Sequence, residues 1–317
     1  YAVPWSPAKG GPLDLTQAIK LDLEIPGETP FSFGQFRKQL LTCSNQGGLY
    51  MFDGSKWHVL QNPKEYNQQI YSMINYNDKL MIAEYPTGHL WVYNGGKITE
   101  LKTAPPVMTG VADWSREVQT TTIYRGDLYV GVWPWAELWR LDSVTQKWRL
   151  ARRMFSYPEL TAELGHPWEK EIAQYNKEHN AKERSNGWGQ RITGLAAHGD
   201  SLLVGTMAYG GWKRNTQLSF LTDEVWAEYG RVTKLTLPGN LAAHVQWKDG
   251  PTTLRFIVTG STMRIEQDGT LLGDVALPPS LAQRSLEGGQ VKFGKGVFGP
   301  MTFKMVSHSI DSSASKK

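Results

Sequence analysis

Cysteine is almost absent from the chain, which has Cys43 alone among 317 residues. A single cysteine excludes an intramolecular disulfide, a multi-cysteine metal cluster and a CxxC redox pair. Long apolar runs are missing as well, since no stretch approaches the roughly 18 residues that a membrane span needs. Together with a mean hydropathy of −0.42, these features predict a soluble globular protein with no membrane span.

Neither sign of charge dominates the sequence. It has 34 Lys and Arg against 30 Asp and Glu, a net charge of +4, and the basic residues are spread out. Nucleic-acid-binding proteins favour a basic stripe or a recognisable module, so we expect no nucleic-acid partner. The small basic excess leaves a mild preference for anionic ligands.

Motifs for common cofactors and nucleophiles are missing too. No GxGxxG or GxxxxGK[ST] loop follows an expected strand and opens a helix, and no GxSxG elbow occurs. The histidines show neither HExxH nor Cys/His ligand spacing. We therefore predict no cofactor and no metal site, and a structural divalent cation is left open.

Aromatic residues, in contrast, are abundant, with 13 Trp, 13 Tyr and 10 Phe. Such a content is typical of repetitive β packing or of sites on which flat ligands stack. The first residue is Tyr rather than Met, which is compatible with a processed or trimmed chain. We expect a secreted or periplasmic protein.

The sequence repeats itself with a period of about 40 to 48 residues. Leu49-Tyr50 aligns with Leu90-Trp91, 41 residues later, and then with Leu138-Trp139, a further 48 residues on. Each copy has an apolar strand, a turn and a second strand, and the turns contain Asn77-Asp78, Gly126-Asp127 and Gly199-Asp200. This period and the alternation of apolar residues are typical of propeller blades.

The fold prediction is therefore an all-β protein: a β-propeller of about five or more four-stranded blades, with a helical insertion and a C-terminal β segment. The expected divisions follow from the copies. They are residues 1–30, an N-terminal segment that could close the ring; 31–238, the blades, with the insertion at 151–189; 239–311, further blades or a small β-sandwich; and 312–317, a disordered tail.

Propeller geometry places the loops between second and third strands on the same face as the connections between blades. On this face the sequence gathers aromatic, Pro and Gly residues, above all in EYPTGHL and VWPWAEL at equivalent positions. Loops on a rigid scaffold are where binding residues concentrate, and aromatic rings suit the apolar faces of sugars. The expected substrate-binding residues are Tyr85, Glu84, Trp133, Trp135, Trp114, Trp188 and Asn45.

The same face carries residue types suited to elimination from a uronic-acid polysaccharide. This reaction needs a cation or hydrogen-bond donor on the substrate carboxylate, and a Tyr or His to move protons at C5 and at the leaving oxygen. The candidate catalytic residues are Tyr209, His166, Arg116, Arg191 and His89.

Architecture and residue types, over about Gln35 to Leu237, resemble those of the β-propeller polysaccharide lyases such as the ulvan lyases. The resemblance implies a class of activity, a lyase acting on an acidic polysaccharide, and transfers no individual catalytic residue. The last part of the chain, GGQVKFGKGVFGPMTFKMVSHSID, resembles the closing strands of a concanavalin-like (laminin G) jelly roll.

Two alternatives stay open. The protein could be a glycoside hydrolase whose two catalytic carboxylates come from Glu84, Asp113, Glu117 and Glu137, provided that a pair of them lies at the separation that hydrolysis requires. It could also be a non-catalytic lectin-like or protein-binding propeller. Because the loops differ between copies, one composite site is favoured over several equal ones. The expected partner is an acidic polysaccharide or oligosaccharide, and the oligomeric state is undetermined.

Overall fold

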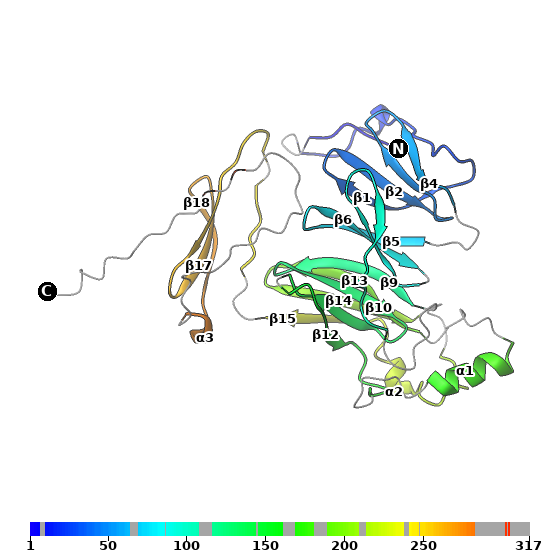
Figure 1. Ribbon diagram of the computed structural model, residues 1–317. Helices are drawn as coiled ribbons and strands as arrows, with labels where there is room; N and C mark the ends of the chain where they lie inside the picture. The colour runs from blue at the N-terminus through cyan, green and yellow to red at the C-terminus, as the bar shows by residue number, and fades with distance from the viewer. Residues whose placement is uncertain are drawn as a thin grey trace.

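The protein is all-β in the computed structural model (Figure 1). The structure describes residues 1–6, 10–63, 69–85, 87–107, 116–143, 145–160, 169–180, 189–208, 214–237, 241–246, 248–282, 302 and 304. Within these ranges it has five antiparallel sheets, which we number I to V in chain order. Helices are short and few.

Each sheet is a meander in which consecutive strands pair. Sheet I comprises β1 (Pro30–Phe36), β2 (Gln39–Ser44), β3 (Leu49–Phe52) and β4 (Trp57–Gln61), and sheet II comprises β5 (Gln69–Tyr76), β6 (Lys79–Tyr85), β7 (Leu90–Tyr93) and β8 (Ile98–Glu100). Sheet III comprises β9 (Glu117–Tyr124), β10 (Asp127–Trp133), β11 (Glu137–Leu141) and β12 (Trp148–Arg153).

The last two sheets have three strands each among the described residues. Sheet IV comprises β13 (Gln190–His198), β14 (Ser201–Ala208) and β15 (Val232–Thr236), and sheet V comprises β16 (Leu254–Val258), β17 (Thr262–Gln267) and β18 (Thr270–Ala276). The helices are η1 (Leu15–Gln17), α1 (Glu169–Glu178), α2 (Asp223–Trp226) and α3 (Pro279–Ala282).

The predicted repeat is confirmed in sheets I to III by strand register. Leu49, Leu90 and Leu138 pair with Cys43, Ala83 and Gly131, so the three leucines occupy one structural position on the third strands. One predicted turn is shifted. Arg125 and Gly126 take the positive φ values of the β9–β10 turn and Asp127 already belongs to β10, because Gly at the second position permits the left-handed conformation.

A second regularity was not apparent in the sequence. The first strand of each of sheets I to IV has a register irregularity that leaves one residue outside the ladder. A β-bulge of this kind bends the strand and redirects a side chain. The bulge residues are Phe31, Tyr71, Gln119 and Thr193.

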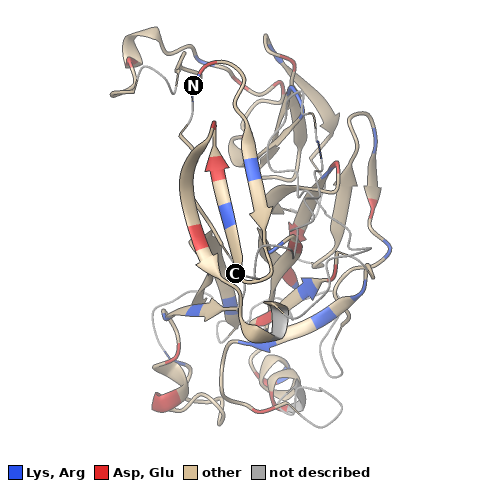
Figure 2. Ribbon diagram, turned by 90° about the vertical axis from the view of Figure 1, so that its left-hand side faces the viewer, with Lys and Arg blue, Asp and Glu red and all other residues tan. Residues whose placement is uncertain are grey.

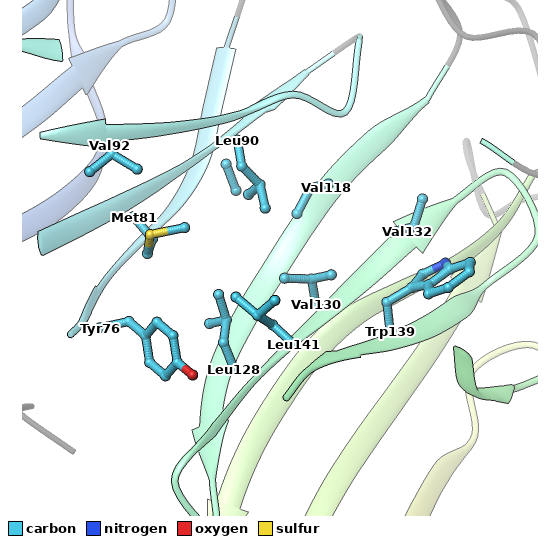
Figure 3. Packing of buried hydrophobic residues seen from close by; sticks show 11 residues of the cluster. Tyr76, Met81, Leu90, Val92, Val118, Leu128, Val130, Val132, Trp139 and Leu141 are labelled. Carbon is cyan, nitrogen blue, oxygen red and sulfur yellow. The ribbon is translucent and has the colours of Figure 1, made fainter. Parts of the chain in front are cut away.

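Sheets I to IV follow one another in space and pack face to face, with their first strands side by side (Figure 1). A separate hydrophobic core fills each of the three junctions. Figure 3 shows the core between sheets II and III, where Met81 and Leu90 of one sheet meet Val118 and Val130 of the other. Alternate residues of the strands of sheets II and III therefore serve two successive cores.

Small residues permit the close approach of neighbouring sheets. A Cβ atom added at Gly131 would lie 2.6 Å from Cβ of Ile192, the residue that sheet IV presents to sheet III. Gly34 of sheet I receives Met73 of sheet II in the same manner, at 2.6 Å. The junctions thus pair a small residue with a larger apolar one.

The structure adjusts several expected boundaries. Residues 151–153 continue β12, so the insertion begins after Arg153, and α1 lies within it. The N-terminal segment makes a bridge between Ala2 and Ile19 and places Glu28 against sheet I. The described residues form no closed ring of sheets. The tail 312–317 lies outside the described residues.

Sheet V stands apart from the other four (Figure 1). Seen from its outer side, in front in Figure 2, its strands carry charged residues. They are Arg255, Arg264, Glu266 and Asp274. Its alternate positions are apolar, among them Leu254, Phe256 and Val258 on β16, which are exposed.

Candidate functional site

The β6–β7 and β10–β11 loops lie beside the starts of the following sheets. A parallel bridge joins Thr87, in the β6–β7 loop, to Arg116 immediately before β9. The equivalent bridge joins Trp135, in the β10–β11 loop, to Gln190 at the start of β13. These bridges hold the predicted loops and strand starts at one edge of the molecule.

Along this edge, residues from successive sheets fall into two rows. The strand starts contribute Gln69, Glu117 and Arg191, which pair with Tyr85, Trp133 and Met207 at the ends of the second strands. The bulges contribute Phe31, Tyr71, Gln119 and Thr193. We call these ten residues the inner rim.

The end of the inner rim formed by sheets I and II is aromatic. The rings of Phe31 and Tyr71 meet edge to face with centroids 5.3 Å apart, and Tyr71 meets Tyr85 in the same way at 5.6 Å. Phe31 is 45% exposed and the two tyrosines are half-buried. Because bulges hold Phe31 and Tyr71 outside the ladder, the cluster is reachable from solvent.

The end formed by sheets III and IV is charged and deeply buried. Arg191 Nη2 lies 2.5 Å from Glu117 Oε1, and the side chains are 8% and 0% exposed. The Arg191 guanidinium also lies over the Trp133 ring, 5.2 Å from its centroid. Burial raises the pKa of the Glu117 carboxyl to about 7, although the Arg191 charge opposes this shift.

The buried polar atoms at this end that have no hydrogen-bond partner in the described part of the structure include an acceptor and a donor beside the Arg191 guanidinium. The acceptor is Oε2 of Glu117 and the donor is Nε1 of Trp133, and both are buried. Buried polar atoms are normally paired with protein or water. The pair of atoms, an acceptor and a donor beside a buried cation, therefore gives the charged end unused hydrogen-bonding capacity.

The other predicted arginine, Arg116, has its hydrogen bonds directed into the protein. Its Nη1 and Nη2 donate to the carbonyl oxygens of Pro105 and Pro106, each at 3.2 Å, and the side chain is 2% exposed. It also packs against Gly88 of the β6–β7 loop. Arg116 therefore fixes the connection between sheets II and III.

Glu84 and Glu137 belong to a structural pattern that sequence reasoning missed. Glu84 accepts a hydrogen bond from Nε1 of Trp91, and Glu137 accepts one from Nε1 of Trp139 at 2.7 Å. In sheet I, Glu28 accepts a hydrogen bond from the equivalent Tyr50. All three carboxylates are buried. The recurring aromatic residue after each aligned leucine was the signal that could have revealed this pattern.

Two of the four tryptophans expected to bind substrate, Trp133 and Trp135, are buried. Trp135 is 0% exposed and packs against Phe220, with ring centroids 5.7 Å apart, in a core that also contains Ile172 of α1. Trp133 lies beneath Arg191 and beside Gly189. Neither ring is open to solvent: α1 and the segment between β14 and β15 cover Trp135, and the start of sheet IV covers Trp133.

Two further predicted residues take part in loop hydrogen bonds. Oδ1 of Asn45 accepts a hydrogen bond from the Thr29 backbone amide at 2.9 Å, and the backbone carbonyl oxygen of Asn45 accepts one from Nε2 of Gln69 at 3.3 Å. His89 is half-buried, with Nδ1 3.3 Å from Glu100 Oε1. The remaining predicted site residues, Tyr209, His166, Trp114 and Trp188, lie outside the described residues.

No group of three or more His, Cys, Asp and Glu side chains in the described ranges is arranged to hold a metal ion. Among the helices that the structure describes, none has the length and apolar character needed to cross a membrane.

Comparisons with known proteins assign no family. No protein-family model matches the chain, and no curated protein matches it. Similar solved structures include the computationally designed Ika4 protein, with 11% identity over 68% of this chain and 96% of that one and a TM-score of 0.36. The extracellular domain of a putative hybrid two-component system from B. thetaiotaomicron has 14% identity over 74% of this chain and 32% of that one, with a TM-score of 0.38.

Proposed function

We propose that the protein binds an acidic polysaccharide along the inner rim. The observation that supports this proposal is the division of the rim into the aromatic end of Phe31, Tyr71 and Tyr85 and the charged end of Glu117 and Arg191. Sugar rings have apolar faces that suit the first end, and uronate carboxylates suit a cation at the second. A sheet arrangement of the propeller type, which we also propose, aligns the two ends.

Binding at the aromatic end is tested by removing its rings. Each stacking contact contributes roughly 0.5–1.5 kcal/mol, so Tyr71→Ala and Tyr85→Ala should each weaken binding of polygalacturonate or alginate about 2- to 13-fold. Tyr71→Phe keeps the ring and should retain the affinity. Phe256→Ala, which removes an exposed ring from sheet V, is the matched control and should leave the affinity unchanged. Equal affinities of all four variants would argue against this site.

The charged end is tested by the choice of polymer. Arg191→Gln should weaken binding of uronic-acid polymers more than binding of their neutral counterparts, because it removes the cation that faces the carboxylate. Circular dichroism and urea unfolding establish first that the variant folds, since Arg191 is buried against Glu117. An equal loss for charged and neutral polymers would show that Arg191 does not recognise the carboxylate.

A second candidate function is cleavage of the same polymer by β-elimination. It is favoured by the presence of tyrosine and arginine on one rim. In this proposal Arg191 stabilises the negative charge that develops on the uronate, and Tyr85, as its phenolate, takes the C5 proton. As the C4–C5 double bond forms and the C4–O bond breaks, the Tyr85 hydroxyl returns that proton to the leaving oxygen.

Product assays separate the candidates. Elimination produces a conjugated uronate that absorbs at about 235 nm, so growth of this signal with anionic polysaccharides would establish a lyase. New reducing ends without that signal would indicate a glycoside hydrolase. Binding without either product would leave the lectin-like function. Since these polymers occur outside cells, the proposal agrees with a secreted or periplasmic location.

A further inference from the structure

The three junctions from sheet I to sheet IV are built in the same way. In each, we call the earlier sheet the receiving sheet and the later one the incoming sheet. A small residue of the second strand pairs with a leucine of the third, as Cys43 with Leu49, Ala83 with Leu90 and Gly131 with Leu138. The leucines are 0–1% exposed. The incoming sheet places Ile70, Val118 or Ile192, at the start of its first strand, in the same core as this pair.

Sheet IV has the same construction on its outer face, against which no sheet of the described residues packs. Gly205 pairs with Val232 at the position of the buried leucines, yet Val232 is 71% exposed. Among the described residues, a Cβ at Gly194 would meet no atom within 4 Å, and one at Gly205 would meet only the Gly194 backbone. The outer face of sheet IV is therefore a receiving face without an incoming sheet in the part of the chain that the structure describes.

Sheet I has the complementary face at the other end of the row. Pro30 occupies in sheet I the position that Ile70, Val118 and Ile192 occupy in sheets II, III and IV. All four residues pair with the equivalent residue of the second strand in their own sheet. Phe33 corresponds to Met73, and both Pro30 and Phe33 are exposed, Phe33 by 56%. Glu28, in the N-terminal segment, covers Tyr50 and accepts a hydrogen bond from its hydroxyl. The part of the face around Pro30 and Phe33 stays exposed.

Sheet V differs from the incoming sheets. Sheets I to IV have their bulge in the first strand, whereas β16 pairs with β17 in unbroken register and the irregularity of sheet V lies between β17 and β18. Its apolar face is also covered in part, since Gly273 lies against Leu241 and Ala243. Sheet I of a second copy is the better match for the receiving face.

We propose that two copies of the chain associate head to tail, with sheet IV of each stacked on sheet I of the other. The contact would repeat an internal junction: Pro30 and Phe33 of one copy would pack over Gly205, Gly194 and Val232 of its partner. Two identical contacts related by a twofold axis close such an assembly. Exposed apolar surfaces of this kind mark interaction sites.

The first experiment measures the mass of the full-length chain by light scattering coupled to size exclusion, over a range of concentrations. The expected result is a dimer, with twice the 35.7 kDa of one chain. Val232→Lys and Phe33→Lys should each weaken dimerisation at least tenfold. Phe256→Lys, at an equally exposed apolar residue of sheet V, should not. A wild-type chain that stays monomeric at every concentration would overturn the proposal.

Mixing the two variants tests the direction of stacking. A Val232→Lys chain has an intact sheet I and a Phe33→Lys chain an intact sheet IV, so a mixed pair keeps one native contact. We expect dimers in the mixture at concentrations at which each variant alone is monomeric. If Phe33→Lys alone dimerises normally, the contact is not head to tail. Both substitutions are at exposed positions, and unchanged urea unfolding serves as the check on folding.

Discussion

The junction between sheets III and IV predicts opposite effects for the same substitution at two equivalent glycines. Gly131 and Gly205 occupy one structural position, and neither has a positive φ. Replacing Gly by Ala at such a position stabilises a protein by about 0.4–1 kcal/mol through the unfolded chain. Gly205→Ala should show this gain, because no described side chain lies within 4 Å of the added Cβ.

Gly131→Ala should instead destabilise the protein. The added Cβ would lie 2.6 Å from Cβ and 2.7 Å from Cγ2 of Ile192, and no side-chain rotation can move the Ile192 Cβ, because it is bonded directly to the β13 backbone. Sheets III and IV would have to separate. Overpacking of this kind costs about 1–3 kcal/mol, so the two variants should differ by about that amount.

Urea unfolding followed by tryptophan fluorescence, at a dilution at which the chain is monomeric, provides the assay. We expect a lower midpoint for Gly131→Ala, a slightly higher one for Gly205→Ala, and similar slopes. Ile192→Val combined with Gly131→Ala removes only Cδ1 and leaves Cβ and Cγ2, the two atoms in close contact, so it should recover little. Equal midpoints of the two glycine variants would refute the explanation of how the sheets pack.

Three further predictions concern buried groups. Folding raises the Glu117 pKa from 4.5 to about 7, so the contribution of this residue to the free energy of unfolding is complete below pH 4.5 and falls by about 3 kcal/mol as the pH rises to and through 7. Glu117→Gln should flatten this part of the curve of stability against pH, and an unchanged curve would contradict the prediction. Burial raises the pKa of the Cys43 thiol to about 12, so labelling by a thiol reagent at pH 8 should follow unfolding, and rapid labelling of the native protein would count against it. Trp135→Ala should cost about 3–5 kcal/mol in urea unfolding, whereas Trp5→Ala, at a residue that is 62% exposed, should cost less than about 0.5 kcal/mol.

The sequence was sufficient to predict the sheets because their signals are local. The alternation of apolar residues and the turn at Asn77-Asp78 depend on neighbours in the chain, and the aligned leucines fixed the register of sheets I to III. The bulges could not be predicted in this way. A bulge depends on how a strand pairs with its partner, and Tyr71 differs from Gln119 in every chemical respect.

The site was predicted less well, because burial depends on distant segments. Trp135 has the sequence context of a stacking residue, yet Phe220 and Ile172 cover it from later insertions. Arg191 lies near the start of β13, and its pairing with Glu117 joins residues 74 positions apart, which sequence patterns do not reveal. The carboxylates of Glu84 and Glu137 are held by tryptophans that alternation alone marks as strand residues.

The bulges also separate two requirements that usually conflict in a β protein. A residue within the ladder must suit its cross-strand neighbours, whereas Phe31, Tyr71, Gln119 and Thr193 lie outside it. Their side chains are therefore freer to change than those on either side of them. These four positions, one from each of sheets I to IV, form a compact set for randomisation, through which ligand preference could be altered by selection while the scaffold stays the same.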